Sequence, residues 1–383
     1  MESGMNPTNR SKTKEFNKPS PNLKSKEIKR ITKLLKKKVY PSINLKMHHN
    51  SKYSETDFLD LLTYVAITHD FTNNGSKTFE LLKENTPASN TVIHHIKKLD
   101  SEYVEKLFMK TFDKLIKEAT KYKPFRKRVD LAIDITEQMY YGDKNDYMVC
   151  ETKPKDGTSH CFRYITINVV ENGKRFTLLA LPMHKFTTKA KVVRKLIEYA
   201  KSKVKIRYVY LDRGFFNSEI INLLKELKVK FLMPAIRNVK IQRFMREYKE
   251  VQSKIIDYDM GYRKYNRAEF KLVFVNDKQG VKRVFATNIV VAEELTQQYF
   301  SWYSKRWGIE TSYRVKGDFK ARTTSKYYSV RLFYFMWSVC LYNIWVLVSL
   351  VVAIIFHIYL KKPLVTAKLF GAVLYSSEPR GIT

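Results

Sequence analysis

The chain has few cysteines and a shortage of acidic residues. Its three cysteines, Cys150, Cys161 and Cys340, show neither CxxC spacing nor a matching histidine cluster. A disulfide framework and a zinc site are therefore not expected, and the pattern is typical of a reduced, cytosolic protein. The amino-terminal segment also lacks the apolar core of a signal peptide, which argues against secretion.

The shortage of acid is pronounced. Asp and Glu number 37 against 71 Lys and Arg, which gives a formal net charge of +34. Such an excess predicts a polyanionic partner, either nucleic acid or an anionic membrane surface. The basic residues are spread through the chain, which favours an extended nucleic-acid footprint. The alternative is a solvated basic surface without a partner, which the self-repulsion of this charge disfavours.

The 383 residues, 44% of them hydrophobic, suffice for two or three domains with a sizeable core. Residues 1–50 are rich in Lys, Ser, Asn and Pro and predict a basic, partly disordered arm. Residues 51–122 predict a helical region. Within it, a short helix over 76–84 and a basic second helix over 90–99 resemble a helix-turn-helix DNA reader. A plain helical bundle is the alternative interpretation.

From residue 129 the periodicity changes to that of strands alternating with helices. We expect strands near 129–134, 146–151, 160–170, 174–181, 205–211 and 229–233, and helices over 188–202 and 217–228. Three strands in hairpin order followed by alternating helix and strand predict an α/β fold with an RNase H-like mixed sheet flanked by helices. Residues 236–290 predict a β-rich insertion or an extension of the sheet.

Three acids occupy suggestive positions. Asp134 and Asp212 each follow an apolar strand, which is where open α/β sheets place their chemistry. Glu310 lies on a helix expected from about residue 293 to 317. Tyr303 and Arg306 precede it at i−7 and i−4 and therefore share its face.

These residue types suit phosphodiester chemistry. Carboxylates hold hard cations such as Mg²⁺, and two ions about 4 Å apart activate a nucleophile and stabilise a leaving oxygen. Arg306 could bind a phosphate bidentately, and Trp302 and Trp307 could hold an unstacked base. Simpler interpretations remain. A strand-end Asp is often a cap, and Arg306 and Glu310 could pair on a helix surface. The neighbouring acids that compete for the role of Asp134 are Asp130, Glu137, Asp143 and Asp146.

An apolar run over 341–356 is long enough to cross a bilayer. A membrane-anchored basic protein is therefore one hypothesis. Asn343 and His357 interrupt the run, and a large sheet needs a covering helix, so we expect a buried core helix.

Taken together, these motifs resemble prokaryotic insertion-sequence transposases with a DDE catalytic domain, in the branch with a Tyr-Arg-Glu-Lys signature. The motifs that carry the resemblance are Leu131–Glu137, Tyr140–Asp143, Tyr210–Phe216, Thr287–Asn288 and Tyr303-x2-Arg306-x3-Glu310.

The resemblance implies that residues 123–383 form an RNase H-like catalytic domain, with 236–290 inserted and 328–361 packed on the core as an apolar helix. It also implies catalysis by Asp134, Asp212 and Glu310 with two Mg²⁺ or Mn²⁺ ions, strand cleavage, and 3′-hydroxyl transfer. The implied partners are terminal inverted repeats, target DNA and further copies of the chain in a dimer or larger assembly. The implied location is cytoplasmic, at the nucleoid, with no membrane. The residues expected to contact DNA are Arg213, Tyr303, Arg306, Trp307, Arg314 and Lys316.

The signature lysine is the one departure. Its position, seven residues after the Glu, is occupied by Gly317, and Lys316 is one position short. On a regular helix Arg314 lies about 40° from Glu310 and Lys316 about 120° away, so geometry favours Arg314 as the substitute. A transposase-derived DNA-binding protein without catalytic activity is the second hypothesis.

Overall fold

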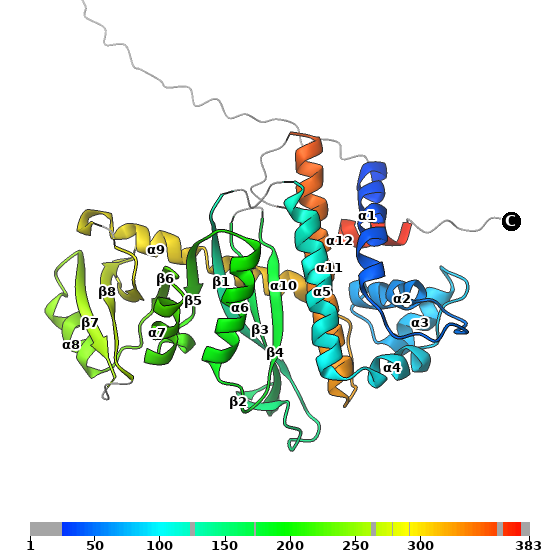
Figure 1. Ribbon diagram of the computed structural model, residues 1–383, viewed down its shortest axis with the longest axis horizontal. Helices are drawn as coiled ribbons and strands as arrows, with labels where there is room; N and C mark the ends of the chain where they lie inside the picture. Colours follow the sequence, from blue (N-terminus) through cyan, green and yellow to red (C-terminus); the bar gives the residue numbers. More distant parts are fainter. Residues whose placement is uncertain are drawn as a thin grey trace, which may run out of the picture.

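The computed structural model describes residues 25–122, 127–171, 174–261, 266–277, 279–290, 292–357 and 363–376. Residues 1–24 of the predicted basic arm lie outside these ranges. The molecule is elongated, with a helical unit at one end, a sheet in the middle and the strands β7 and β8 at the other end (Figure 1). The predicted fold class, a mixed sheet flanked by helices with a helical amino-terminal region, is confirmed.

The amino-terminal helices are α1 (Ser25–Val39), α2 (Glu55–Ile67), α3 (Thr72–Glu80), α4 (Ser89–Lys98) and α5 (Ser101–Thr120). Helix α3 begins earlier than its predicted start at residue 76. Gly75 lies inside this helix, and a Cβ atom there would come to 2.5 Å from Val65 Cγ2, so the glycine allows α3 to pack closely on α2. DNA reading by α3 and α4 stays a prediction.

The sheet follows the order β2-β3-β1-β5-β6-β9-β8-β7, with β4 paired to β3. Its strands are β1 (Val129–Met139), β2 (Val149–Lys155), β3 (Thr158–Val169), β4 (Thr177–Met183), β5 (Ile206–Leu211), β6 (Phe231–Pro234), β7 (Ser253–Met260), β8 (Ala268–Asn276) and β9 (Lys282–Thr287). Strand β1 is antiparallel to β3 and parallel to β5. Because β9 pairs with β6, the β-rich segment extends the same sheet; it also carries a short helix, α8 (Val239–Glu247).

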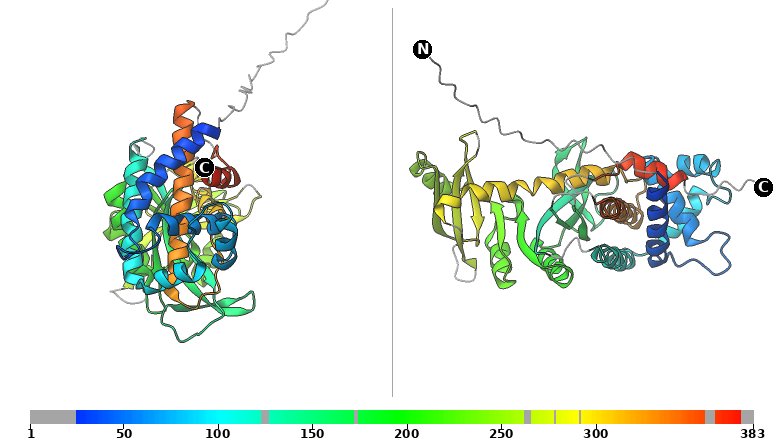
Figure 2. Two further views of the ribbon diagram at one scale, coloured as in Figure 1. Left: turned by 90° about the vertical axis from the view of Figure 1, so that its right-hand side faces the viewer. Right: turned by 90° about the horizontal axis from the view of Figure 1, so that it is seen from above.

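Helices cover both faces of the sheet. Helices α6 (Lys189–Lys203) and α7 (Ser218–Glu226) lie on one face, and α9 (Gln297–Ser304) and α10 (Trp307–Gly317) lie on the other (Figure 2). Successive side chains of β1 point to opposite faces of the sheet, and both faces are apolar. Leu131 and Ile133 belong to one hydrophobic cluster, and Ala132 belongs to the other. A strand that is buried on both faces is a central strand, and β1 is therefore a rigid base for polar side chains.

The apolar run forms α11 (Tyr328–Ile355), which is buried as predicted. Within the described ranges it is the one helix long and apolar enough to cross a membrane, and 89% of its apolar window is buried inside the protein. It packs against α1, α4, α5, α10 and β4, so these elements supply its apolar surroundings. The short helix α12 (Ala367–Ser376) follows it and packs on α1.

Asn343 of α11 docks the helix onto β4. Its Oδ1 accepts from Thr177 N at 2.9 Å, and its Nδ2 donates to Thr177 O at 2.8 Å. Replacing Asn343 with leucine should lower the free energy of unfolding by about 2–4 kcal/mol, because two buried backbone groups lose their partners. Urea denaturation measures this.

Ser349 is the matched control on the same helix, because its buried hydroxyl has no hydrogen-bond partner among the described residues. Replacing Ser349 with alanine should leave stability unchanged or slightly raised. Equal losses for Asn343→Leu and Ser349→Ala would contradict the docking role of Asn343.

Candidate active site

Asp134 and Asp212 lie side by side at one edge of two neighbouring strands. The parallel pairing of β1 with β5 ends at Ile133 opposite Leu211, so the next residue on each side is one of the two acids: Asp134 within β1, and Asp212 directly after β5. Neighbouring strands lie about 4.8 Å apart, which brings the two carboxylates together. The prediction that Asp134 ends its strand is wrong, because β1 continues to Met139 in its pairing with β3.

The surroundings of this pair disfavour negative charge. Burial, followed by the nearby carboxylates of Asp212 and Glu310, raises the pKa of Asp134 to about 6, although Arg306 opposes the rise. The Oδ1 atom of Asp212 is buried and has no hydrogen-bond partner among the described residues. Two adjacent, poorly solvated carboxylates are a site that a bound cation would stabilise.

Arg306 lies between the third acid and this pair. Its Nη2 donates to Glu310 Oε1 at 2.7 Å, and its Nη1 lies 3.7 Å from Asp134 Oδ2. Its guanidinium also lies over the Tyr303 ring at 5.6 Å. The predicted stripe of tyrosine, arginine and acid is therefore assembled in contact with Asp134.

The helix that carries this stripe is interrupted, contrary to prediction. It divides at Lys305 and Arg306 into α9 and α10, and the junction has tighter bonds, such as Ile309 N to Arg306 O at 2.8 Å. Lys305 Nζ donates to Asp130 Oδ2 at 2.7 Å, four residues before Asp134 on the same face of β1. Two consecutive cations of the junction thus contact two carboxylates of one strand.

Asp130 was a competing candidate for the first catalytic acid, and the structure gives it a structural role. It is fully buried and accepts from Arg207 Nε at 2.6 Å and from the Tyr210 hydroxyl at 3.0 Å. Burial alone would raise its pKa, but hydrogen bonds from Arg207 and Lys305 hold that pKa below its usual value. A carboxylate neutralised in this way anchors the α9–α10 junction to the sheet.

The predicted cluster of three carboxylates is only partly present. Across the ranges that the structure describes, no three His, Cys, Asp or Glu side chains gather closely enough to hold a metal ion together. Asp134 and Asp212 are neighbours, but the Glu310 side chain is 56% exposed and paired with Arg306. The carboxylate pair fits a divalent cation, and Glu310 could join it after separating from Arg306.

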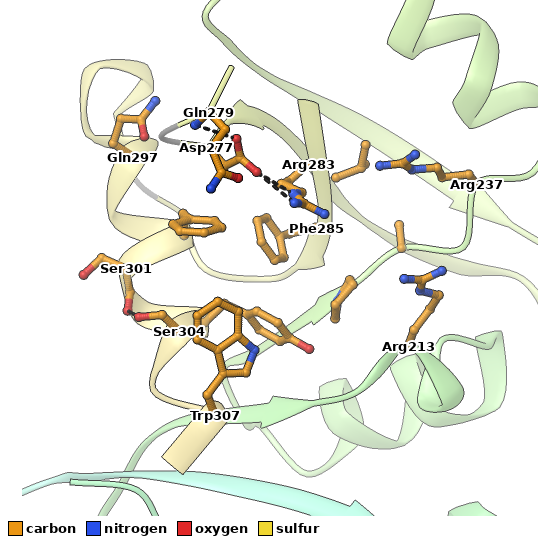
Figure 3. Close-up of a pocket in the computed structure, with 15 residues that line it drawn as sticks. Arg213, Arg237, Asp277, Gln279, Arg283, Phe285, Gln297, Ser301, Ser304 and Trp307 are labelled. Atoms are coloured by element: carbon orange, nitrogen blue, oxygen red, sulfur yellow. Dashed lines mark hydrogen bonds and ion pairs between the residues drawn. The ribbon is translucent and has the colours of Figure 1, made fainter. Parts of the chain in front are cut away.

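Two further candidates, Arg213 and Trp307, line a cavity of about 830 Å³ together with Tyr303. Figure 3 shows Arg213 and Trp307 on opposite sides of this cavity, with Arg283 and Arg237 beyond them. Trp307 is 55% exposed, so its ring is accessible to a base. Trp302, also predicted to hold a base, instead packs against Tyr208 at 5.1 Å.

Helical geometry favoured Arg314 over Lys316 as the substitute for the signature lysine, and the structure shows the opposite arrangement. The Lys316 side chain is buried, and its Nζ donates to Asn168 Oδ1 at 3.0 Å. Burial lowers the pKa of Lys316 to about 7, although the charge of Asp134 opposes this. Arg314 is exposed. The reason is that the sheet-facing side of α10 runs through the buried Ile309 and Lys316 rather than through Glu310.

Comparison with known protein families identifies the chain. The model of the transposase DDE domain matches residues 149–344, just over half of the 383 residues. The chain belongs to the DDE transposase family. The matched segment contains Asp212 and Glu310 and begins after Asp134.

The fold of the transposase resembles a solved structure. It is similar to the cryo-EM structure of a piggyBac transposase synaptic complex with hairpin DNA, with a TM-score of 0.60 and 13% sequence identity. The similarity covers 92% of this chain and 78% of the other. A search of curated proteins finds no match.

The raised pKa of Asp134 makes the stability of the transposase pH-dependent. The folded protein keeps this proton up to about pH 6, whereas the unfolded chain releases it near 3.8. Between these two pH values the folded state binds more protons than the unfolded chain. The contribution of the Asp134 proton to the free energy of unfolding is therefore fully present below pH 3.8 and is lost as pH rises through about 6. Asp134→Asn should therefore raise the free energy of unfolding by about 2 kcal/mol at pH ~8 and change it little at pH ~4.

Urea denaturation of both proteins at the two pH values measures this effect. Asp143 provides the control, because it is exposed and its replacement by asparagine should change stability at neither pH. A stability difference between wild type and Asp134→Asn that does not vary with pH would contradict the electrostatic account.

Proposed function

We propose that this transposase cleaves DNA strands at the ends of a mobile element of the insertion-sequence type and transfers the freed 3′-hydroxyl into target DNA. The observation that carries the proposal is the adjacency of Asp134 and Asp212 at the end of the β1–β5 pairing, beside Arg306. Paired carboxylates and a guanidinium on a basic chain suit the binding of a metal ion and a phosphodiester.

Asp134 and Asp212 would hold Mg²⁺ or Mn²⁺, two ions when the site is complete, with Glu310 as the third ligand. When bound, such ions lower the pKa of water and stabilise the leaving oxygen of an in-line displacement. The chain's own contribution is to fix the two aspartates on a rigid sheet and to keep the site partly dry. The Tyr313 hydroxyl, which donates to Asp134 O at 3.1 Å, holds α10 against β1 at this point.

Arg306 would couple DNA binding to completion of the site. A phosphate that approaches the guanidinium competes with Glu310 for Nη2, because Glu310 Oε1 accepts from that atom at 2.7 Å and a phosphate can accept from two guanidinium donors at once. When Arg306 pairs with phosphate, the Glu310 carboxylate is released beside the two aspartates. The third ligand would then become available only after DNA has bound.

The proposed partners are terminal inverted repeats and target DNA. Trp307 and Arg213 would contact the strand near the cleavage point, while α3 and α4 within residues 51–122 and the basic arm over 1–50 would add further contacts. The piggyBac relative is described as a synaptic complex with hairpin DNA. For this chain we likewise propose DNA ends held by a dimer or larger assembly, at the nucleoid, with residues 123–383 as the catalytic domain.

The DNA that flanks the gene provides the first test. Inverted repeats bracketed by short direct repeats are expected there. A terminal-repeat duplex, carrying one such repeat and adjoining flank, should then be cut by the purified protein in Mg²⁺ to leave a 3′-hydroxyl, and joined to a plasmid target. Binding of the duplex without cleavage in Mg²⁺ or Mn²⁺ would instead favour a non-catalytic DNA-binding protein, the hypothesis to which Gly317 at the signature position points.

A further inference from the structure

A second cavity lies at the far end of α10 from Trp307. It has a volume of about 560 Å³ and lies at the junction of the helical unit, β1 and the segment after α10. We refer to it as the basic pocket and define it by Tyr141, Gly317, Lys320, Arg322, Lys326 and Arg331, which all line it. The proposed function gives these residues no role.

The charge of the basic pocket has one sign. Four cations line it, and no carboxylate does. The side chains of Lys320 and Lys326 make no ion pair within the described part of the chain, and Arg322 lies over the Phe71 ring at 5.4 Å. Burial, with the nearby charge of Arg331, lowers the pKa of Lys320 to about 8. This cavity therefore holds positive charge that no acid of the described chain neutralises.

The wall of the basic pocket is firmly packed. Tyr140 is buried, with Phe162 at 4.6 Å and the Arg331 guanidinium at 5.0 Å from its ring. A Cβ atom at Gly142 would meet the Tyr140 hydroxyl at 2.3 Å, so the turn closes tightly over this ring. On the other side Arg322 N donates to Asp70 O at 2.9 Å, which ties the pocket to the helical unit. A pocket whose walls are held in this way can bind a ligand without rearrangement of its side chains.

The pocket is also well placed with respect to the carboxylates. Helix α10 begins at Trp307 in the first cavity and ends at Gly317 in the basic pocket, with Glu310 between them. The eleven residues of this helix advance about 15 Å from the first to the last. One strand of B-form DNA advances about 3.4 Å per nucleotide, so four or five nucleotides cover the same distance.

We propose that the basic pocket binds backbone phosphates of the DNA strand that crosses the carboxylates, four or five nucleotides from the phosphate at Arg306. The inference rests on the proposed function and adds to it a second, sequence-independent contact. Phosphate is the favoured ligand because it pairs with several Lys and Arg donors at once, and the pocket offers donors from two parts of the chain. Its role would be to set the path of the strand on the side of α10 away from Trp307.

Gly317 permits a test that removes no existing contact. A Cβ atom there would meet no other atom within 4 Å, and its backbone has ordinary helical geometry, so larger residues fit. Gly317→Glu places a carboxylate in the pocket, and Gly317→Gln is the uncharged control of the same shape. We expect Gly317→Glu to bind the terminal-repeat duplex about tenfold more weakly than wild type, and Gly317→Gln to bind within about twofold, in EDTA by fluorescence anisotropy.

A second pair of variants tests whether the effect is local. The pocket variant, Arg322→Ala/Lys326→Ala, removes two exposed cations of the basic pocket. The control, Lys114→Ala/Lys191→Ala, removes two exposed lysines of α5 and α6. These two helices lie on the opposite side of the sheet from α10 (Figure 2). A plot of log affinity against log salt concentration has a negative slope. For the pocket variant this slope should become shallower by about two, and for the control it should change little.

The outcomes separate the two proposals. Wild-type protein that does not distinguish the terminal-repeat duplex from a scrambled one would overturn the proposed function. If wild type binds the terminal-repeat duplex specifically, and Gly317→Glu and Gly317→Gln bind it with equal affinity, the proposal for the basic pocket alone would be overturned. Equal slopes for the pocket variant and the α5–α6 control would do the same.

Discussion

Replacing Asp212 with asparagine should abolish strand cleavage and leave DNA binding nearly unchanged. The substitution keeps the shape of the side chain and removes the negative charge beside Asp134. The loss should be about a thousandfold or more, which corresponds to about 4 kcal/mol of transition-state stabilisation. Single-turnover cleavage of the terminal-repeat duplex in Mg²⁺ measures it, and anisotropy in EDTA measures binding.

Folding provides the check on this experiment. Asp212 Oδ1 is buried without a partner among the described residues, so asparagine should not destabilise the protein. Asp143→Asn, an exposed aspartate beyond the end of β1, is the matched control and should cleave like wild type. Cleavage by Asp212→Asn within tenfold of wild type would remove Asp212 from the catalytic set.

Arg306→Gln should lower cleavage by about 10²–10³-fold, the range found when one preorganised donor is removed. The same substitution removes the only cation that forms an ion pair with Asp134 or Glu310 in the described chain. The carboxylates then repel one another, so the melting temperature in EDTA should fall, and excess Mg²⁺ should restore more of it than in wild type. Cleavage rates and melting curves with and without Mg²⁺ test both effects.

Arg194 is the control for Arg306, because it makes an equally short arginine–glutamate pair with Glu226 on the surface. Arg194→Gln should change neither cleavage nor the response to Mg²⁺. Arg306→Lys should recover only part of the activity, since an ammonium keeps the charge but cannot bind a phosphate with two parallel hydrogen bonds. Full activity of Arg306→Gln would contradict the coupling of Arg306 to phosphate.

The sequence predicts the central part of the fold because local patterns are sufficient there. The alternation Leu131-Ala-Ile-Asp134 places the acid on one face of a strand, and the apolar strand before Asp212 places the second acid at the end of its neighbour. Parallel pairing then brings the two together, as predicted.

The remainder depends on contacts between distant segments. Lys316 and not Arg314 faces the sheet because the orientation of α10 is set by burial of Ile309, which helical spacing from Glu310 cannot reveal. The division of the helix at Arg306 follows the bond between Lys305 and Asp130, 175 residues apart in sequence. No local pattern in the sequence indicates that pairing.

We expect a divalent cation to bind at the end of the β1–β5 pairing. Fe²⁺ bound in place of Mg²⁺ reduces added hydrogen peroxide to hydroxide and a hydroxyl radical, itself becoming Fe³⁺, and the radical cuts the polypeptide near the ion. Oxygen ligands accept either metal. With the terminal-repeat duplex bound, we expect cuts near residues 134 and 212, suppressed by excess Mg²⁺ and absent in Asp212→Asn. Wild-type protein that is not cut near either residue, or a pattern unchanged in Asp212→Asn, would contradict the account.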